Sequence, residues 1–125
     1  MKLFSKNDIE PVALPGRRVW KGVGRDALVP SERITYGYAR YAADFGPMEP
    51  HNHAEEVCFV IDAQDAWVRF GSEKDRMGGK TALEPGMTMH FPPLEWHVFG
   101  YEEGGYLEIL FIYGQVDRIR PEEME

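Results

Sequence analysis

Short strand-forming segments separated by glycine and proline turns are the feature of this 125-residue sequence that most constrains its fold. Turn signals such as Gly78-Gly79, Pro85-Gly86 and Gly104-Gly105 separate segments rich in β-branched and aromatic residues. This rhythm is typical of an all-β sandwich or barrel. The pattern predicts strands over residues 18–23, 34–41, 57–62, 66–70, 80–83, 88–91, 97–101 and 106–113.

The length of the chain fits a single domain. No internal repeat is visible, and no boundary falls inside residues 18–113, which are expected to form the barrel. Residues 1–16 show no clear period and are expected to be an N-terminal arm that packs on a neighbour. Residues 117–125 combine charge with a proline and are expected to be a C-terminal tail with a short frayed helix.

Composition limits which kinds of partner and which cellular location we expect for this protein. The formal net charge of −7 disfavours nucleic acid, because neutralising phosphates requires Lys and Arg. The single cysteine, Cys58, excludes an internal disulfide and suggests a reducing compartment. Residues 1–11 carry Asp8 and Glu10 without the apolar run of a signal peptide, and no segment approaches the ~20 apolar residues of a membrane helix. We therefore expect a soluble cytoplasmic protein with no nucleic-acid or membrane partner.

A small basic cluster stands out against this acidic background. Arg17, Arg18 and Lys21 lie together at the start of the first predicted strand. One interpretation is a solvated edge strand. The other is an anion contact for a substrate or for a neighbouring subunit.

The candidate metal ligands begin with a closely spaced group. His51 and His53 are two residues apart, so on a strand their side chains project from the same face. Glu56 follows at an odd offset, and a tight turn at Ala54-Glu55 would place it at the start of the next antiparallel strand. Imidazole and carboxylate together suit iron, manganese, nickel or zinc. These residues therefore predict part of a site for one divalent ion per chain.

A fourth ligand is expected from a distant strand, and His97 fits this position after the Pro92-Pro93 turn. Two rival residues are weighed against the set. Glu55 neighbours Glu56 and is expected to face solvent. His90 lies between Met89 and Phe91 in a predicted strand and is expected to be structural and outward-facing.

Two segments together resemble the paired motifs of the cupin family. Residues 46–56 resemble the first motif, a glycine followed by His-x-His and a glutamate, and residues 84–97 resemble the second, a Pro-Gly turn, a proline and a histidine. The resemblance covers roughly residues 35–113 and implies a single cupin barrel, a double-stranded β-helix or jelly roll. The gap between His53 and Glu56 is one residue shorter than the usual family spacing, and Ala63 replaces a usual glycine.

The strand after the ligands predicts which side chains face the site. If Glu56 points inward, so do Cys58 and Val60, whereas Val57, Phe59 and Ile61 form an apolar outer face. In cupins a second subunit commonly covers that face, so the resemblance implies a homodimer.

One earlier strand carries candidate catalytic residues. Tyr36, Tyr38 and Arg40 share one strand face, and Tyr41 lies on the other. If that face points into the barrel, Tyr38 and Arg40 are candidate catalytic residues, a tyrosine as acid, base or anchor and an arginine for a carboxylate or phosphate. The alternative is that the aromatic residues fill the core or an interface.

The predicted site allows several functions. Four protein ligands on an octahedral metal leave two positions for a substrate, with or without dioxygen. The sequence therefore favours a metal-dependent enzyme acting on a small polar or anionic metabolite, with oxygenase slightly ahead of lyase or isomerase. The alternative class is a non-catalytic cupin that binds a sugar or another metabolite.

Overall fold

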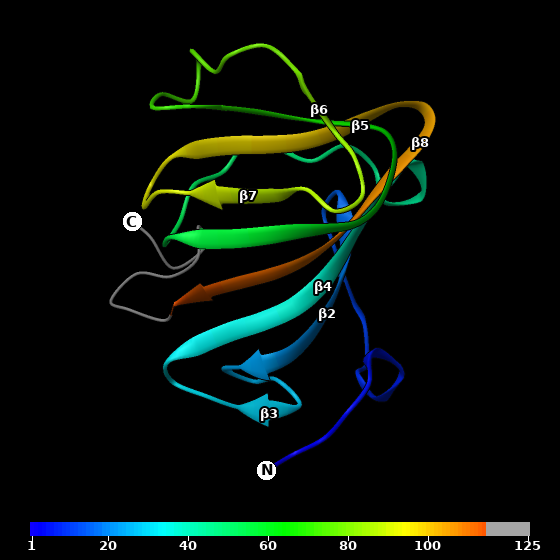
Figure 1. The fold of residues 1–125 in the computed structure, drawn as a ribbon, viewed down its shortest axis with the longest axis vertical. Helices are drawn as coiled ribbons and strands as arrows, with labels where there is room; N and C mark the ends of the chain where they lie inside the picture. The colour runs from blue at the N-terminus through cyan, green and yellow to red at the C-terminus, as the bar shows by residue number, and fades with distance from the viewer. Residues whose placement is uncertain (115–125) are drawn as a thin grey trace.

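The chain folds as a single jelly-roll barrel in a computed structural model, which describes residues 1–114 (Figure 1). The strands pair in the order β1-β2-β4-β8-β5-β6, with β3 beside β2 and β7 beside β5. Their bounds are β1 Val12–Leu14, β2 Arg17–Gly24, β3 Val29–Pro30, β4 Ile34–Ala42, β5 Glu56–Gly71, β6 Thr81–Leu83, β7 Thr88–Phe91 and β8 Trp96–Gly114. Two 3-10 turns complete the described chain, η1 Lys6–Asp8 and η2 Ala43–Phe45. No helix within residues 1–114 is long and apolar enough to cross a membrane.

Two long bent strands, β5 and β8, run through both halves of the barrel. They pair antiparallel from Glu56↔Tyr113 to Gly71↔Trp96, with register shifts after Val60 and after Gln64. Each of them joins two segments that the sequence predicted as separate strands. The predicted breaks are therefore bends within continuous strands.

The core lies between the inward faces of these strands. Along the first part of β5, Glu56, Cys58 and Val60 are buried while the residues between them are about two-fifths exposed. This alternation confirms the predicted inward and outward faces. The buried cluster includes Val60, Leu107 and Ile109, which are at most 1% exposed.

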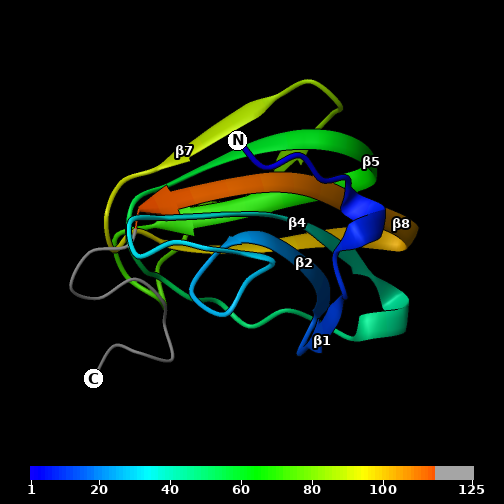
Figure 2. The ribbon, with the colours of Figure 1, turned by 90° about the horizontal axis from the view of Figure 1, so that it is seen from below.

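The N-terminal segment folds onto its own barrel. Strand β1 pairs antiparallel with the start of β2, and Ile9 is 6% exposed. Phe4 lies so close to Gly22 that a β-carbon there would come within 2.7 Å of its ring. Figure 2 shows this segment running along the barrel beside β2. The expected arm is thus largely part of the domain, and the expected tail, residues 117–125, lies outside the described residues.

Candidate metal centre

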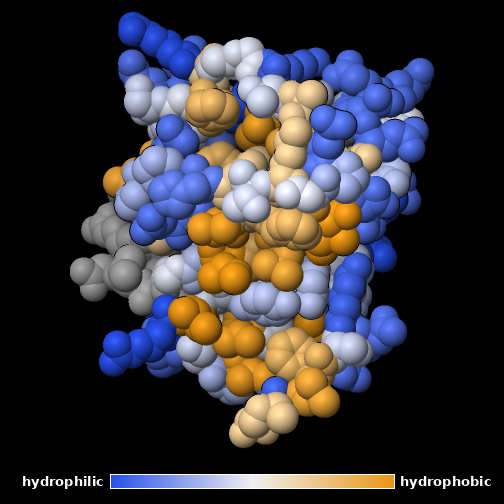
Figure 3. Space-filling view, viewed as in Figure 1, coloured by the Kyte–Doolittle hydropathy of each residue, from blue (hydrophilic) through white to orange (hydrophobic). Residues whose placement is uncertain are grey.

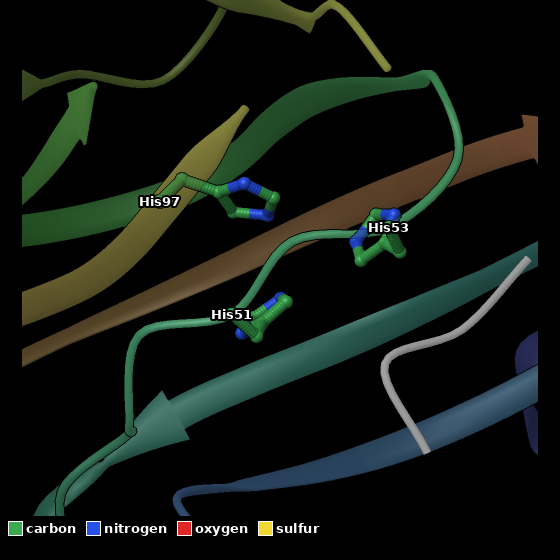
Figure 4. Close-up of side chains that lie close together, drawn as sticks. All are labelled: His51, His53 and His97. Atoms are coloured by element: carbon green, nitrogen blue, oxygen red, sulfur yellow. The ribbon is translucent and has the colours of Figure 1, made fainter. Parts of the chain in front are cut away.

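Three histidines converge at one end of the barrel. His51, His53 and His97 each offer a ring nitrogen, and these atoms all lie within 4.8 Å of one another. The ring centroids are 5.3 Å apart for His51 and His53, 4.5 Å for His51 and His97, and 5.2 Å for His53 and His97. Figure 4 shows the rings gathered around a common point. Two segments more than forty residues apart therefore build one cluster, as predicted.

Backbone hydrogen bonds fix the two histidine-bearing segments to each other. The His51 amide donates to the His97 carbonyl at 3.0 Å, and the His97 amide donates back to the His51 carbonyl at 2.9 Å. The amide of Leu94 donates to the His53 carbonyl at 2.8 Å, and the Asn52 side chain donates to the Leu94 carbonyl at 3.0 Å. These bonds hold the backbones that carry the three imidazoles next to each other.

The second nitrogen of each imidazole is turned toward a backbone carbonyl. Nδ1 lies 2.8 Å from the Ala54 carbonyl in His53, 3.0 Å from the Glu95 carbonyl in His97, and 3.4 Å from the Glu49 carbonyl in His51. A carbonyl accepts but cannot donate, so these contacts favour the tautomer protonated at Nδ1 and leave the Nε2 lone pair available. Metal-binding histidines are commonly oriented by the same kind of contact.

One ring nitrogen gives a direct test of whether the cluster suits an ion. Nε2 of His97 is buried and has no hydrogen-bond partner among residues 1–114. An unpartnered buried polar atom is costly, and a divalent ion between the rings would provide its missing partner. The donor set therefore fits a metal ion.

A buried carboxylate, that of Glu56, lies beside two of the three rings. Oε1 of Glu56 is 3.3 Å from Nε2 of His53 and 3.5 Å from Nε2 of His97. Burial raises the pKa of Glu56, but the contacts and charges of His53 and His97 outweigh it and bring the pKa to about 2. Glu56 is the first residue of β5, as the sequence predicted, and its carboxyl is ionised at neutral pH.

The two rival residues lie outside this cluster. Glu55 Oε2 is 2.6 Å from Nε2 of His90, and both side chains are more than half exposed. Both therefore face outward, as the sequence predicted. Cys58 lies buried behind Glu56, where burial raises the pKa of its thiol well above the ordinary value.

Tyr38 and Arg40 do not face the histidines. Their strand face points to the outside of the barrel, because the buried positions of β4 are Thr35, Gly37, Ala39 and Tyr41, with Ala42 buried at the end of the strand. The Tyr38 hydroxyl lies 2.9 Å from the Tyr36 hydroxyl, and Arg40 forms an ion pair with Glu108. The condition for assigning them to the site, an inward-facing strand face, is not met.

A cavity of about 470 Å³ opens beside the histidines. Its lining includes His51, His53 and Glu56, together with apolar residues from β1, β2, β4 and β8. Arg17 and Tyr41 also line it, and sequence reasoning did not place either of them there. The alternation of β4 placed Tyr41 opposite Tyr38 but left open which side was inward. The cavity is the size of a typical small-molecule site.

The geometry makes a prediction about pH. Burial and the charges of His97, His53 and Arg17 lower the pKa of His51 from 6.5 to about 3, against a weaker opposing effect of the Glu49 carbonyl. In the metal-free protein His51 therefore stays neutral at pH 5, and NMR titration of its ring should show protonation only near pH 3. Between these values the unfolded chain binds more protons than the folded one, so unfolding free energy falls as pH is lowered from 6.5 toward 3.

The matched comparison is His51→Gln. Without the imidazole, the metal-free variant should lose less stability between pH 6.5 and 4.5 than the original protein, measured by urea unfolding. An ordinary titration of His51 near pH 6.5 would contradict the burial of its ring in this cluster.

The jelly roll and the histidine cluster together define a cupin-like barrel with three histidines positioned to bind a metal ion. No protein-family model matches the chain, and no curated protein matches it in sequence. Several solved structures share the fold. The polyketide cyclase RemF from Streptomyces resistomycificus is 18% identical with a TM-score of 0.70, over 100% of this chain and 87% of that one.

Two further structures extend the comparison. Fe(II)-HppE with the alternative substrate (S)-1-HPP is 12% identical with a TM-score of 0.67, over 90% of this chain and 60% of that one. The W96F oxalate decarboxylase of B. subtilis is 21% identical with a TM-score of 0.67, over 94% of this chain and 31% of that one. At these identities the likeness establishes the fold, and the reaction must be argued from the site itself.

Proposed function

We propose that this protein is a metal-dependent enzyme that binds one divalent ion on His51, His53, Glu56 and His97 and acts on a small anionic metabolite. The observation that carries the proposal is the cluster of imidazoles, whose Nδ1 atoms lie near backbone carbonyls and which each offer a ring nitrogen within 4.8 Å of the others. Glu56 adds an ionised carboxylate within 3.5 Å of two of these nitrogens. The cavity beside the cluster supplies room for a substrate.

The charge of this ligand set favours an anionic substrate. Three neutral imidazoles and one carboxylate would leave a net charge of about +1 around a divalent ion. Such an ion would supply a Lewis acid and, if redox-active, a site for dioxygen chemistry. The chain's own contribution is to hold the donors, to orient the imidazoles through carbonyl contacts, and to keep Cys58 protonated behind the carboxylate.

The reaction class is the finer part of the proposal. A mixed histidine and carboxylate set suits iron, which favours an oxygenase, whereas zinc, manganese or nickel would serve a lyase or isomerase equally well. The named chemistries of the similar structures differ, being a cyclase, an Fe(II) protein and a decarboxylase. They support an enzyme on this fold without selecting one reaction. A cytoplasmic location also remains a prediction from the sequence.

The test is metal content followed by turnover. The protein is purified without chelator or affinity metal, its ions are measured, and it is then loaded separately with iron, manganese, nickel or zinc. A panel of small carboxylates, phosphates and sugars is screened in air and without air. Turnover only with iron and only in air indicates an oxygenase, while turnover without air and with zinc or manganese indicates a lyase or isomerase. Tight binding without product for every metal would overturn the enzyme and leave a binding protein.

A homodimer is part of the same proposal. Val57, Phe59, Ile61 and Ile112 are each 40–43% exposed, and Val57 pairs directly with Ile112 across β5 and β8. Figure 3 shows hydrophobic side chains gathered over the middle of one face of the molecule. An apolar patch of this kind marks an interaction surface, and pairing of two identical patches about a two-fold axis is the commonest way to bury one.

We expect Phe59→Glu to convert a dimer to monomers, because it places a charge in the centre of this patch. The measurement is sedimentation at micromolar concentration, with metal content measured in parallel. Phe70→Glu is the matched control, since Phe70 is 45% exposed on the other half of β5. Metal content should be unchanged in both variants, and a stable monomer in the unaltered protein would refute the dimer.

A further inference from the structure

Arg17 is a charged residue of the cavity that has no part in the proposed metal site. Arg17 is the first residue of β2, and it lines the same cavity as His51 and Glu56. Val19, two residues on, lines the cavity as well, whereas Arg18 is exposed and lies 4.9 Å from the ring of Phe45. Alternation along the strand thus sends Arg17 inward and its basic neighbour outward.

The turn before Arg17 is held tightly against the segment that leads to the histidines. Gly16 has φ +82°, and its amide donates to the Phe45 carbonyl at 2.9 Å. A β-carbon at Gly16 would lie only 2.7 Å from Cα of Met48, so the two segments are in close contact. Nη1 of Arg17 donates to the Pro15 carbonyl at 3.0 Å. The backbone before Arg17 is therefore held against the segment that leads to His51, and the Arg17 guanidinium is held by the Pro15 carbonyl.

The guanidinium has unused donors. Among residues 1–114 no carboxylate forms an ion pair with Arg17, and its side chain donates one hydrogen bond there, to the Pro15 carbonyl. Arg17, Tyr41 and His51 all line this cavity. Asp8, Glu10, Asp26 and Lys21 also line the cavity. The Asp8 carboxylate already accepts from the Ser5 amide at 2.7 Å.

We propose that Arg17 binds a carboxylate of the substrate while a second oxygen group of the same molecule meets the metal ion, which makes the substrate a small dicarboxylate or a similar dianion. This inference rests on the proposed metal-dependent function. A guanidinium presents paired N–H donors that match the two oxygens of a carboxylate. Burial raises the pKa of Tyr41 far above its ordinary value, so its hydroxyl stays protonated beside Arg17 and can donate a further hydrogen bond.

The experiment measures binding of simple anions by calorimetry, in metal-free protein and in protein loaded with zinc. The probes are succinate and glutarate, each compared with the monocarboxylate of equal carbon number, butyrate and valerate. Arg17→Gln removes the charge, Arg17→Lys keeps it, and Arg18→Gln is the matched control on the outer side of the same strand. Metal content and thermal unfolding of every variant are recorded alongside.

Loss of one charge-assisted contact should lower dicarboxylate affinity of the zinc-loaded Arg17→Gln protein by about tenfold to a hundredfold. Monocarboxylate affinity and zinc content should be unchanged, Arg17→Lys should recover part of the loss, and Arg18→Gln should behave as the original protein. A merely structural role for Arg17 would not separate the two kinds of anion.

Two results would overturn this inference. The first is that Arg17→Gln binds succinate and glutarate as well as the original protein does. The second is that all of its anion affinities fall together with its zinc content. Failure of the proposed metal function looks different, since the unaltered protein would then bind anions equally with and without zinc. In that case the metal-free comparison of Arg17→Gln with Arg18→Gln still decides whether Arg17 holds the carboxylate.

Discussion

Replacing His97 by Gln should reduce the affinity for a divalent ion by more than about 100-fold. Mutating a residue that only hydrogen-bonds to a metal ligand costs about 10- to 100-fold, and loss of a ligand itself should cost more. The side chain is 1% exposed, and its Nε2 is a buried nitrogen without a hydrogen-bond partner among residues 1–114, with Oε1 of Glu56 3.5 Å away. The ring also stacks on Phe91, with centroids 4.0 Å apart, so glutamine is preferred to alanine because it leaves a smaller void. The measurement is elemental analysis together with competition against a chromophoric chelator.

The control for this change is His90→Gln. His90 lies on β7, seven residues before His97, but it faces outward and contacts Glu55. Its replacement should leave the metal content unchanged. Full occupancy in a folded His97→Gln protein would exclude the four-ligand site and, with it, the proposed function.

Leu107→Ala should lower the free energy of unfolding by about 2–5 kcal/mol, the range found when large buried aliphatic side chains are truncated. Leu107 is 0% exposed and belongs to the core cluster, where β8 pairs with both β4 and β5 at this residue. Backbone from both neighbouring strands surrounds the site, so collapse into the void would have to distort both pairings. Urea unfolding of the metal-free protein gives the value directly.

The comparison for Leu107 is Leu3→Ala, since Leu3 is 90% exposed. That change should alter the unfolding free energy by less than about 0.5 kcal/mol. Equal effects of the two substitutions would contradict the position of Leu107 in the core.

The sequence predicted the strands whose own residues carry the signal. The β2 and β4 segments, for example, were predicted to within one residue at each end. The predicted gap at residues 63–65 was wrong in that β5 continues through it, with Asp65 at φ 52° beside a register shift. The two-residue β3 and the three-residue β1 were missed, because such short strands are defined by pairing with β2 rather than by their own composition.

For the candidate site, too, some residues could be predicted from the sequence and others could not. The three histidines could be predicted because local spacing and one distant motif bring them together. Tyr38 and Arg40 were candidates only if their strand face pointed inward. Alternation gives two faces without saying which one is inward, and the burial pattern of β4 puts the other face inward. Arg17 was noticed as a basic residue, but its approach to His51 depends on the contact between Gly16 and Met48.

The paired backbone hydrogen bonds between His51 and His97 have a consequence for how the cell would fill this centre. These hydrogen bonds do not involve the imidazoles, so the two histidine-bearing segments stay joined whichever ion lies between the rings. One ion can therefore be exchanged for another without the barrel opening. Protein sites with histidine and carboxylate ligands select their metal largely by geometry and by which metal is available, rather than by affinity alone. On the proposed function, the identity of the bound ion would then follow the supply of metal in the cell.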